Sequence, residues 1–189
     1  IKLSTSLDRI GIITFSNKSN VVMDLEYMIE ENKNKAIKSI ENIKPDCTTN
    51  LYAGIYEGLK MLNDRQNKDN LGALFVLTDG LPNIRPPRGE EFMISKFISQ
   101  NPDFKCILNT YGFGYQLDSK MLFNISNMFN SAFSFISSYD MIGTVFINTI
   151  SKILLMNKDD LDIKKENNDE IRVIVYKKLY EIIDSLNNY

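Results

Sequence analysis

The segment Leu74-Phe75-Val76-Leu77-Thr78-Asp79-Gly80 decides the fold class of this 189-residue chain. Its first five residues are apolar or β-branched without interruption, and the run ends at an Asp-Gly pair. Such a run is typical of a strand that is buried on both faces and followed by a turn. Strands of this kind occur in parallel sheets with helices on both sides, so the segment predicts an α/β protein.

Short apolar runs recur on either side of this segment and alternate with amphipathic stretches. Further strands are predicted at residues 10–15, 106–111 and 132–136, and a hairpin after the first leads to an edge strand at 21–23. Helices are predicted at residues 30–43, 50–63, 89–100, 119–128 and 141–155. The alternation predicts a mostly parallel sheet flanked by helices.

The Met and Phe residues between positions 121 and 146 follow the periodicity of core positions. We expect most of them to be buried: Met121, Phe123, Met128, Phe129, Phe133, Phe135, Met141 and Phe146.

The composition changes after residue 155. Residues 156–169 are charged and polar, which predicts a linker. Beyond them, apolar residues at helical spacing predict an amphipathic C-terminal helix over residues 170–189. The first part of that segment, residues 171–176, is rich in β-branched residues, so a strand there stays open as an alternative.

The composition excludes several kinds of site. The 22 basic and 24 acidic residues leave a net charge of −2, which argues against a nucleic-acid binder and a polybasic membrane contact. Without histidine there is no Ser-His-Asp triad and no His-containing zinc site. Two cysteines, Cys47 and Cys106, are too few for a four-thiolate site. The start at Ile1 has neither an initiator Met nor a signal-peptide layout, so we expect the chain to be cut from a longer protein.

Polar residues gather where predicted strands end and helices begin. Asp79 ends the buried strand, while Thr48, Thr49 and Asn50 precede a predicted helix. Ligands of parallel sheets bind outside the carboxyl ends of the strands. Hydroxyl and carboxylate oxygens suit a hard cation such as Mg²⁺ or Ca²⁺ rather than zinc. The alternative is structural, because Asp-Gly pairs form turns and Thr48 and Thr49 are placed to cap the helix.

Several segments, in order, resemble a von Willebrand factor type A domain. They are Asp8-Arg9-Ile10-Gly11-Ile12-Ile13-Thr14-Phe15, Thr49-Asn50-Leu51-Tyr52-Ala53-Gly54-Ile55, Leu77-Thr78-Asp79-Gly80-Leu81-Pro82-Asn83, residues 110–114 with Leu117-Asp118, residues 133–136 and residues 142–146. The resemblance covers about residues 1–155 and implies a Rossmann-like, doubly wound fold. The later segments look most like intracellular members found in ubiquitin-ligase-type proteins.

The resemblance implies a metal-ion-dependent adhesion site. Members of the family build it from an Asp-x-Ser-x-Ser loop after the first strand, a Thr in a second loop and an Asp in a third. Thr49 and Asp79 match the last two positions. Such a site leaves one metal position for an Asp or Glu of a partner protein, which a divalent cation with few protein charges attracts. The neighbouring residues are then expected to touch the partner: Thr48, Asn50, Gly80, Asn83 and Arg85.

The sequence departs from the family pattern at its start. No Asp-x-Ser-x-Ser occurs in the 189 residues, and the central strand of the family is missing with it. A sheet without its middle strand leaves the backbone groups of two neighbouring strands unpaired. We expect the missing segment to lie upstream of Ile1, and Mg²⁺ binding is conditional on it. The alternative is that residues 171–176 fill the gap as a strand that brings no metal ligands.

These observations predict a non-enzymatic, cytoplasmic protein-interaction domain that binds a partner carboxylate through a divalent cation, with no nucleic-acid or membrane partner. The alternative is a metal-free scaffold domain within a larger intracellular protein of the ubiquitin-ligase type. A third interpretation is an enzyme in which Asp79 accepts a phosphoryl group. That chemistry would require a Lys after a later strand, where this chain has Gly112-Phe113-Gly114 instead.

Overall fold

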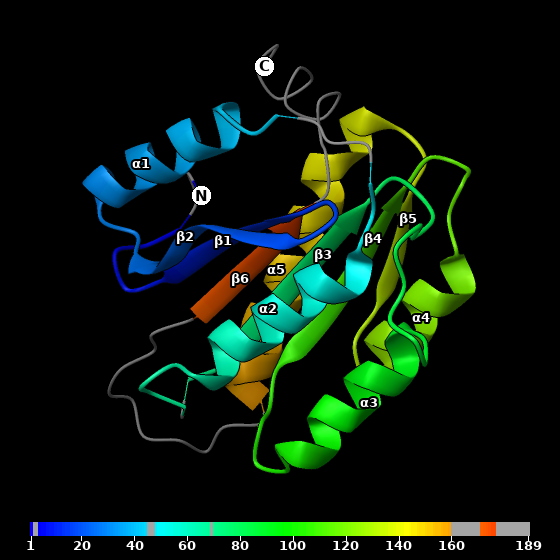
Figure 1. Cartoon of the computed structure of the whole chain (residues 1–189). Helices are drawn as coiled ribbons and strands as arrows, with labels where there is room; N and C mark the ends of the chain where they lie inside the picture. Colours follow the sequence, from blue (N-terminus) through cyan, green and yellow to red (C-terminus); the bar gives the residue numbers. More distant parts are fainter. Residues whose placement is uncertain (2–3, 45–47, 69, 160–170, 177–189) are drawn as a thin grey trace.

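The computed structural model describes residues 1, 4–44, 48–68, 70–159 and 171–176. They form a six-stranded sheet in the order β2-β1-β6-β3-β4-β5, with helices on both faces (Figure 1). The strands are β1 (Arg9–Phe15), β2 (Ser19–Tyr27), β3 (Gly72–Thr78), β4 (Ile107–Phe113), β5 (Phe133–Ile136) and β6 (Ile171–Tyr176). Each neighbouring pair is parallel except the β1–β2 hairpin, which is antiparallel. The predicted Rossmann-like α/β class and the edge strand are confirmed.

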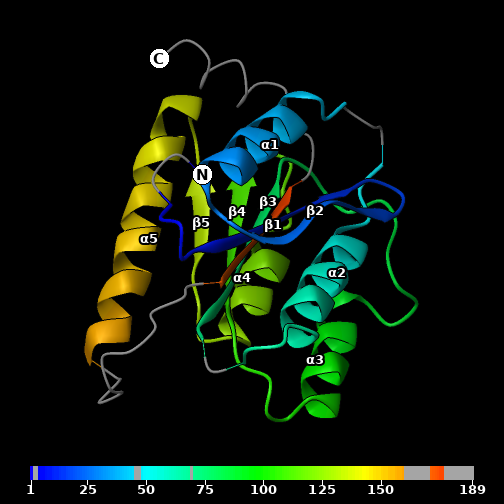
Figure 2. The same ribbon diagram turned by 90° about the vertical axis from the view of Figure 1, so that its left-hand side faces the viewer.

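The helices lie in two layers, one on each face of the sheet (Figure 2). They are α1 (Glu30–Glu41), α2 (Leu51–Asn63), α3 (Glu90–Gln100), α4 (Ser119–Asn127) and α5 (Ile142–Asp159), with a short 3₁₀ turn, η1 (Tyr139–Met141), before α5. One layer contains α2, α3 and α4, and the other contains α1 and α5. The five helices predicted from apolar spacing are therefore present.

Strand β3 contributes side chains to the hydrophobic cores on both faces of the sheet, because successive side chains of a strand point to opposite faces. All seven of its residues are buried. Leu74 and Val76 pack in the core beneath α2, α3 and α4, whereas Phe75 packs in the core beneath α5. On the α5 side, Tyr111 stacks on Phe146 with ring centroids 4.7 Å apart. This double burial is what the uninterrupted apolar run at residues 74–78 predicts.

Strand β6 lies between β1 and β3, in the middle of the sheet (Figure 1). The helix predicted over residues 170–189 is therefore wrong for residues 171–176; residues 177–189 lie outside the described residues. Helical spacing of apolar residues competes here with a β-branched run, Ile-Arg-Val-Ile-Val-Tyr. Pairing decides the outcome, because β1 and β3 would otherwise leave backbone N–H and C=O groups buried without partners.

The position of β6 also changes the expected domain boundary. The gap in the sheet is filled by residues 171–176, which sequence analysis held only as an alternative to a segment upstream of Ile1. The sheet consequently extends beyond the predicted domain of residues 1–155. Helix α5 continues to Asp159, into the predicted linker of residues 156–169, and residues 160–169 lie outside the described residues.

The predicted Met and Phe core is only partly correct. Met121 is buried, and Phe133 and Phe146 pack against the cores. By contrast, Phe123, Phe135 and Met141 are 55%, 45% and 48% exposed. Phe123 belongs to α4, and Phe135 and Met141 lie at the end of the edge strand β5 and just beyond it. The spacing of apolar residues does not show whether a neighbouring helix or strand covers a given position.

Arg65 holds the connection between α2 and β3. Its side chain is buried, and its guanidinium donates hydrogen bonds to the carbonyl oxygens of Leu62 (2.5 Å), Asn67 (3.1 Å), Lys68 (3.4 Å) and Asn70 (3.0 Å). Gly72 leaves room for it, since a Cβ there would lie 3.2 Å from Arg65 Nη1. Burial lowers the pKa of Arg65 from its usual value. One cation therefore satisfies several carbonyl groups of the segment that leads into β3.

Replacing Arg65 is expected to destabilise the fold. Arg65→Met keeps much of the apolar stem but removes the donors, leaving carbonyl groups near the core without partners. We expect a loss of about 2–4 kcal/mol in the free energy of unfolding. The control is Lys96→Met on the exposed side of α3, expected to change stability by less than about 0.5 kcal/mol. Urea unfolding followed by circular dichroism measures both; equal midpoints for the two variants would contradict the role of Arg65.

Candidate functional site

Loops from distant parts of the sequence meet at one end of the sheet. Strands β1, β3, β4, β5 and β6 are linked by parallel pairings, so their carboxyl ends lie at the same edge (Figure 2). We call the residues that follow these ends, together with residues 48–50 before α2, the carboxyl edge. It comprises residues 16–18, 48–50, 79–89, 114–118 and 137–141. This is where parallel sheets bind ligands.

Hydrogen bonds join the loop before α2 to the loop after β3. The Thr49 amide donates to Asn83 Oδ1 at 2.8 Å, and the Thr49 carbonyl accepts from the amides of Asn83 at 3.1 Å and Ile84 at 3.3 Å. Thr49 is 2% exposed. The predicted metal residue Thr49 and the predicted partner residue Asn83 are thus brought into direct contact.

Asn50 connects the same loop to the end of β1 and caps α2. Its amide donates to the Ser16 carbonyl at 2.6 Å, and its Nδ2 donates to the Asn17 carbonyl at 3.1 Å. Its Oδ1 accepts from the Ala53 amide at 3.0 Å, so Asn50 is the N-cap. The predicted capping by Thr48 and Thr49 is wrong, because the helix begins one residue later and places Asn50 at the capping position.

The remaining residues predicted for this loop region have different exposures. Asp79 directly follows β3 and is exposed, and Gly80 is partly buried. The Gly80 carbonyl accepts a hydrogen bond of 3.3 Å from Thr78 Oγ1. Thr48 Oγ1 is buried and has no hydrogen-bond partner among the described residues. Asp79 therefore presents its carboxylate at the surface of the edge, while Thr48 and Thr49 lie deeper.

The donors at this edge do not complete a site for a hard cation. Thr49 and Asp79 offer oxygen ligands of the right type, but Mg²⁺ takes about six ligands in octahedral geometry. Within the described residues no group of three or more acidic or Cys side chains is placed to hold a metal ion. The Asp-x-Ser-x-Ser loop that the family resemblance implies is absent from the sequence. Thr49 and Asp79 alone do not fit the implied metal.

Arg85 is held by two acidic residues from different helices. Its guanidinium lies 3.5 Å from Glu90 Oε2 at the start of α3 and 3.4 Å from Asp118 Oδ2, the N-cap of α4. The Glu90 side chain is 2% exposed and that of Arg85 is 46% exposed. A buried carboxylate needs a compensating positive charge, and Arg85 supplies it to Glu90. Arg85 therefore holds the proline-containing loop in place, although part of its side chain faces solvent.

One further contact fastens the end of the loop that leads into α3, and another joins α3 to α4. The Arg88 guanidinium lies 3.7 Å from the ring centroid of Phe92, a cation–π contact. Asn124 Nδ2 donates to Glu91 Oε1 at 2.6 Å and links α4 to α3. The loop at residues 79–89 is thus anchored along its length rather than held only at its ends.

Exposed apolar side chains lie at the same edge, and sequence analysis did not nominate them. Tyr115 follows β4 and is 91% exposed; its ring lies 6.1 Å from that of Phe135. Leu81, after β3, is 52% exposed. The signal in the sequence is the glycine at position 114, which forms a turn with a φ of 75°, because residues that follow such a turn lie in a surface loop. Phe135 was instead taken for a core residue.

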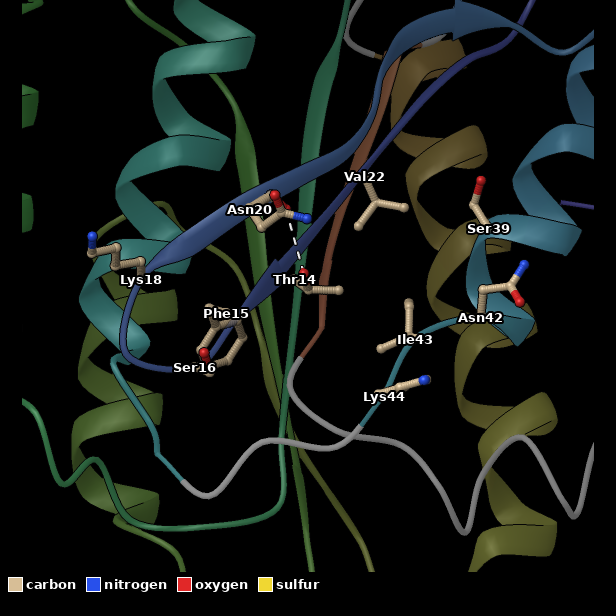
Figure 3. A pocket seen from close by; sticks show the side chains of 10 residues that line it. All are labelled: Thr14, Phe15, Ser16, Lys18, Asn20, Val22, Ser39, Asn42, Ile43 and Lys44. Carbon is tan, nitrogen blue, oxygen red and sulfur yellow. Dashed lines mark hydrogen bonds between the residues drawn. The ribbon is translucent and has the colours of Figure 1, made fainter.

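A polar hollow lies beside β1, apart from the residues nominated from the sequence. It has a volume of about 500 Å³ and lies between the β1–β2 hairpin and the end of α1 (Figure 3). Its lining residues are Thr14, Phe15, Ser16, Lys18, Asn20, Val22, Ser39, Asn42, Ile43 and Lys44. Thr14 Oγ1 donates to the Asn20 carbonyl at 3.5 Å. Only the loop at residues 16–18 is shared with the carboxyl edge.

The structure also bears on the reactivity of a cysteine thiol and on membrane spans. Cys106 precedes β4 and packs partly buried against the core, and burial raises the pKa of its thiol, which disfavours the nucleophilic thiolate. Cys47 lies outside the described residues. No helix in the described part of the chain combines the length and apolar character that a membrane span requires.

Comparisons with known proteins agree with this architecture. Residues 2–81 match the family model of the von Willebrand factor type A domain. No curated protein matches the chain. Proximal thread matrix protein 1 from the mussel byssus aligns over 76% of this chain and 34% of its own, with 17% identity and a TM-score of 0.56. The chain spans about a third of the length of that protein.

A second solved structure, an uncharacterized membrane-spanning protein from Vibrio fischeri, aligns over 77% of this chain and 76% of its own. Its identity is 15% and its TM-score 0.36. The mussel protein, at 17% identity, shows a shared fold alone. The match to the von Willebrand factor type A family covers residues 2–81, and the helix-covered parallel sheet has the Rossmann-like arrangement.

Proposed function

We propose that this chain is a non-enzymatic protein-interaction domain whose partner binds at the carboxyl edge. Von Willebrand factor type A domains generally mediate protein–protein interactions. The main evidence that the partner binds at the carboxyl edge is that Tyr115 is 91% exposed and lies beside the partly exposed ring of Phe135. Large aromatic side chains dominate the binding energy of many interfaces. Here they stand next to the loops that sequence analysis nominated.

The organisation of the loops supports binding in the same place. Thr49 and Asn83 fasten two loops together, and Arg85 fastens the second of these loops to α3 and α4. Loops that are already ordered lose little conformational freedom when a partner binds. Polar groups of Asn83 and Asp79 near the apolar Leu81 provide the mixture of polar and apolar contacts that interfaces use.

The role of a divalent cation divides this proposal into two forms. In the metal-dependent form, Thr49 and Asp79 help to hold Mg²⁺, and a partner Asp or Glu completes its ligands. That form also needs an Asp-x-Ser-x-Ser loop, which these 189 residues do not contain. The metal-free form needs only the surface described above, and we propose it for this chain. The cytoplasmic location and the ubiquitin-ligase-type context remain predictions from the sequence.

Site-specific photocrosslinking tests the location of the interface. A photoreactive phenylalanine analogue at Leu81 or Tyr115 is expected to crosslink a defined partner. The same analogue at Gln66 or Asp103, exposed at the opposite end of the sheet, is the control. Tyr115→Ala should weaken binding of the captured partner at least about tenfold, the effect of losing an interfacial aromatic anchor. Crosslinking only from the control positions would place the interface elsewhere.

Chelation separates the two forms of the proposal. For the 189-residue chain we expect no saturable Mg²⁺ binding by calorimetry. We also expect partner affinity in EDTA to stay within about twofold of its value in Mg²⁺, since a twofold change is only about 0.4 kcal/mol. Asp79→Asn, which keeps the shape but removes the charge, is the matched variant. Loss of binding both in EDTA and in Asp79→Asn would instead establish the metal-dependent form.

A further inference from the structure

Strand β6 is the last described segment of the chain, yet it forms the centre of the sheet. It pairs with β1 from Arg9↔Ile171 to Thr14↔Tyr176 and with β3 from Gly72↔Ile171 to Leu77↔Tyr176. Within the sheet, the β1–β2 hairpin meets the β3–β4–β5 group only through β6. Six residues near the end of the chain therefore supply the backbone pairing that joins the two parts.

The element before β6 packs independently of it. Helix α5 is anchored through Ile142, Val145, Phe146 and Ile150 to the core formed by β3, β4 and β5. Eleven residues separate its end at Asp159 from Ile171. Fully extended, they span up to about 36–40 Å. Helix α5 can therefore stay in place on one copy of the chain while β6 pairs within another.

The space that β6 occupies fits a strand that pairs in parallel with both β1 and β3. Its two walls are the backbone edges of β1 and β3, each with six residues in register with β6. Buried side chains line it from both layers: Ile13, Leu74 and Val76 on the α2 side, and Ile10, Ile12 and Phe75 on the other. An empty space here would leave backbone groups of both strands unpaired in an apolar surrounding, which costs several kcal/mol.

We propose that β6 exchanges between two copies of this chain, giving a dimer in which each β6 completes the sheet of the other copy. The segment that enters the space between β1 and β3 is residues 171–176 of a second copy. The structure shows that this segment pairs in register with both strands. Exchange reuses every contact of the closed form, so the dimer needs no new complementary surface. Closed monomers prevail when dilute, since a tethered strand has an effective concentration in the millimolar range. This inference is independent of the partner proposed above.

Disulfide trapping tests the exchange. Thr14 and Tyr176 are register partners, so Thr14→Cys in one chain and Tyr176→Cys in another place two thiols side by side only when β6 has moved between copies. The two variants are mixed, unfolded in urea, refolded together at high concentration and oxidised. We expect a covalent dimer of twice the mass of the 21.7 kDa chain on a non-reducing gel.

The controls are the single variants and the double variant in one chain. Each single variant refolded alone measures disulfides that involve Cys47 or Cys106. The double variant, refolded when dilute, should form the bond within one chain and migrate as a monomer. No mixed dimer above the single-variant background, with the internal bond formed, would overturn the exchange. Absence of the internal bond as well would overturn the placement of β6 and the exchange with it.

Discussion

The parallel pairing of β6 with β1 and β3 joins the two halves of the sheet. Without it the β1–β2 hairpin and the β3–β4–β5 group would each end in a buried, unpaired strand edge. Helix α2 packs across this junction, with Ile55 and Leu59 in the core that also contains Ile13 and Leu74. Because β6 pairs with β1 and β3, which lie far earlier in the sequence, the sheet closes only after long-range contacts have formed, the kind that slow folding.

The candidate binding edge is a consequence of the same sheet. Parallel strands bring the loops at residues 16–18, 48–50 and 79–89 to one end, and backbone hydrogen bonds then join them around Thr49 and Asn50. Arg85 extends this order to α3 and α4 by pairing with the buried Glu90 and with Asp118. The result is a pre-ordered surface with exposed aromatic groups. Such a surface suits protein recognition, because ordered loops and exposed aromatic side chains favour interfaces.

Sequence patterns predicted most elements of the fold but missed the central strand and the exposed aromatic side chains. The strands and helices up to residue 155 were predictable because their apolar residues follow a strong local periodicity, whereas the cap of α2 was predicted at Thr48 and Thr49 instead of Asn50. Residues 171–176 were assigned to a helix because periodicity considers one segment at a time, whereas their strand state depends on β1 and β3. Tyr115 and Phe135 were missed or misassigned for the same reason, since exposure depends on which elements cover a position.

Local sequence patterns alone predicted the α/β class, the buried β3 strand, the helices beside it, and the nomination of Thr49, Asn50, Asp79 and Asn83 as neighbours at one edge. These features follow from local patterns and from the rule that parallel strands end together. Three features were visible only in the folded chain: the segment that completes the sheet, the pairing of Arg85 with Glu90 and Asp118, and the exposed aromatic rings at the edge. These outcomes depend on pairing and burial between segments distant in the chain, which no local pattern encodes.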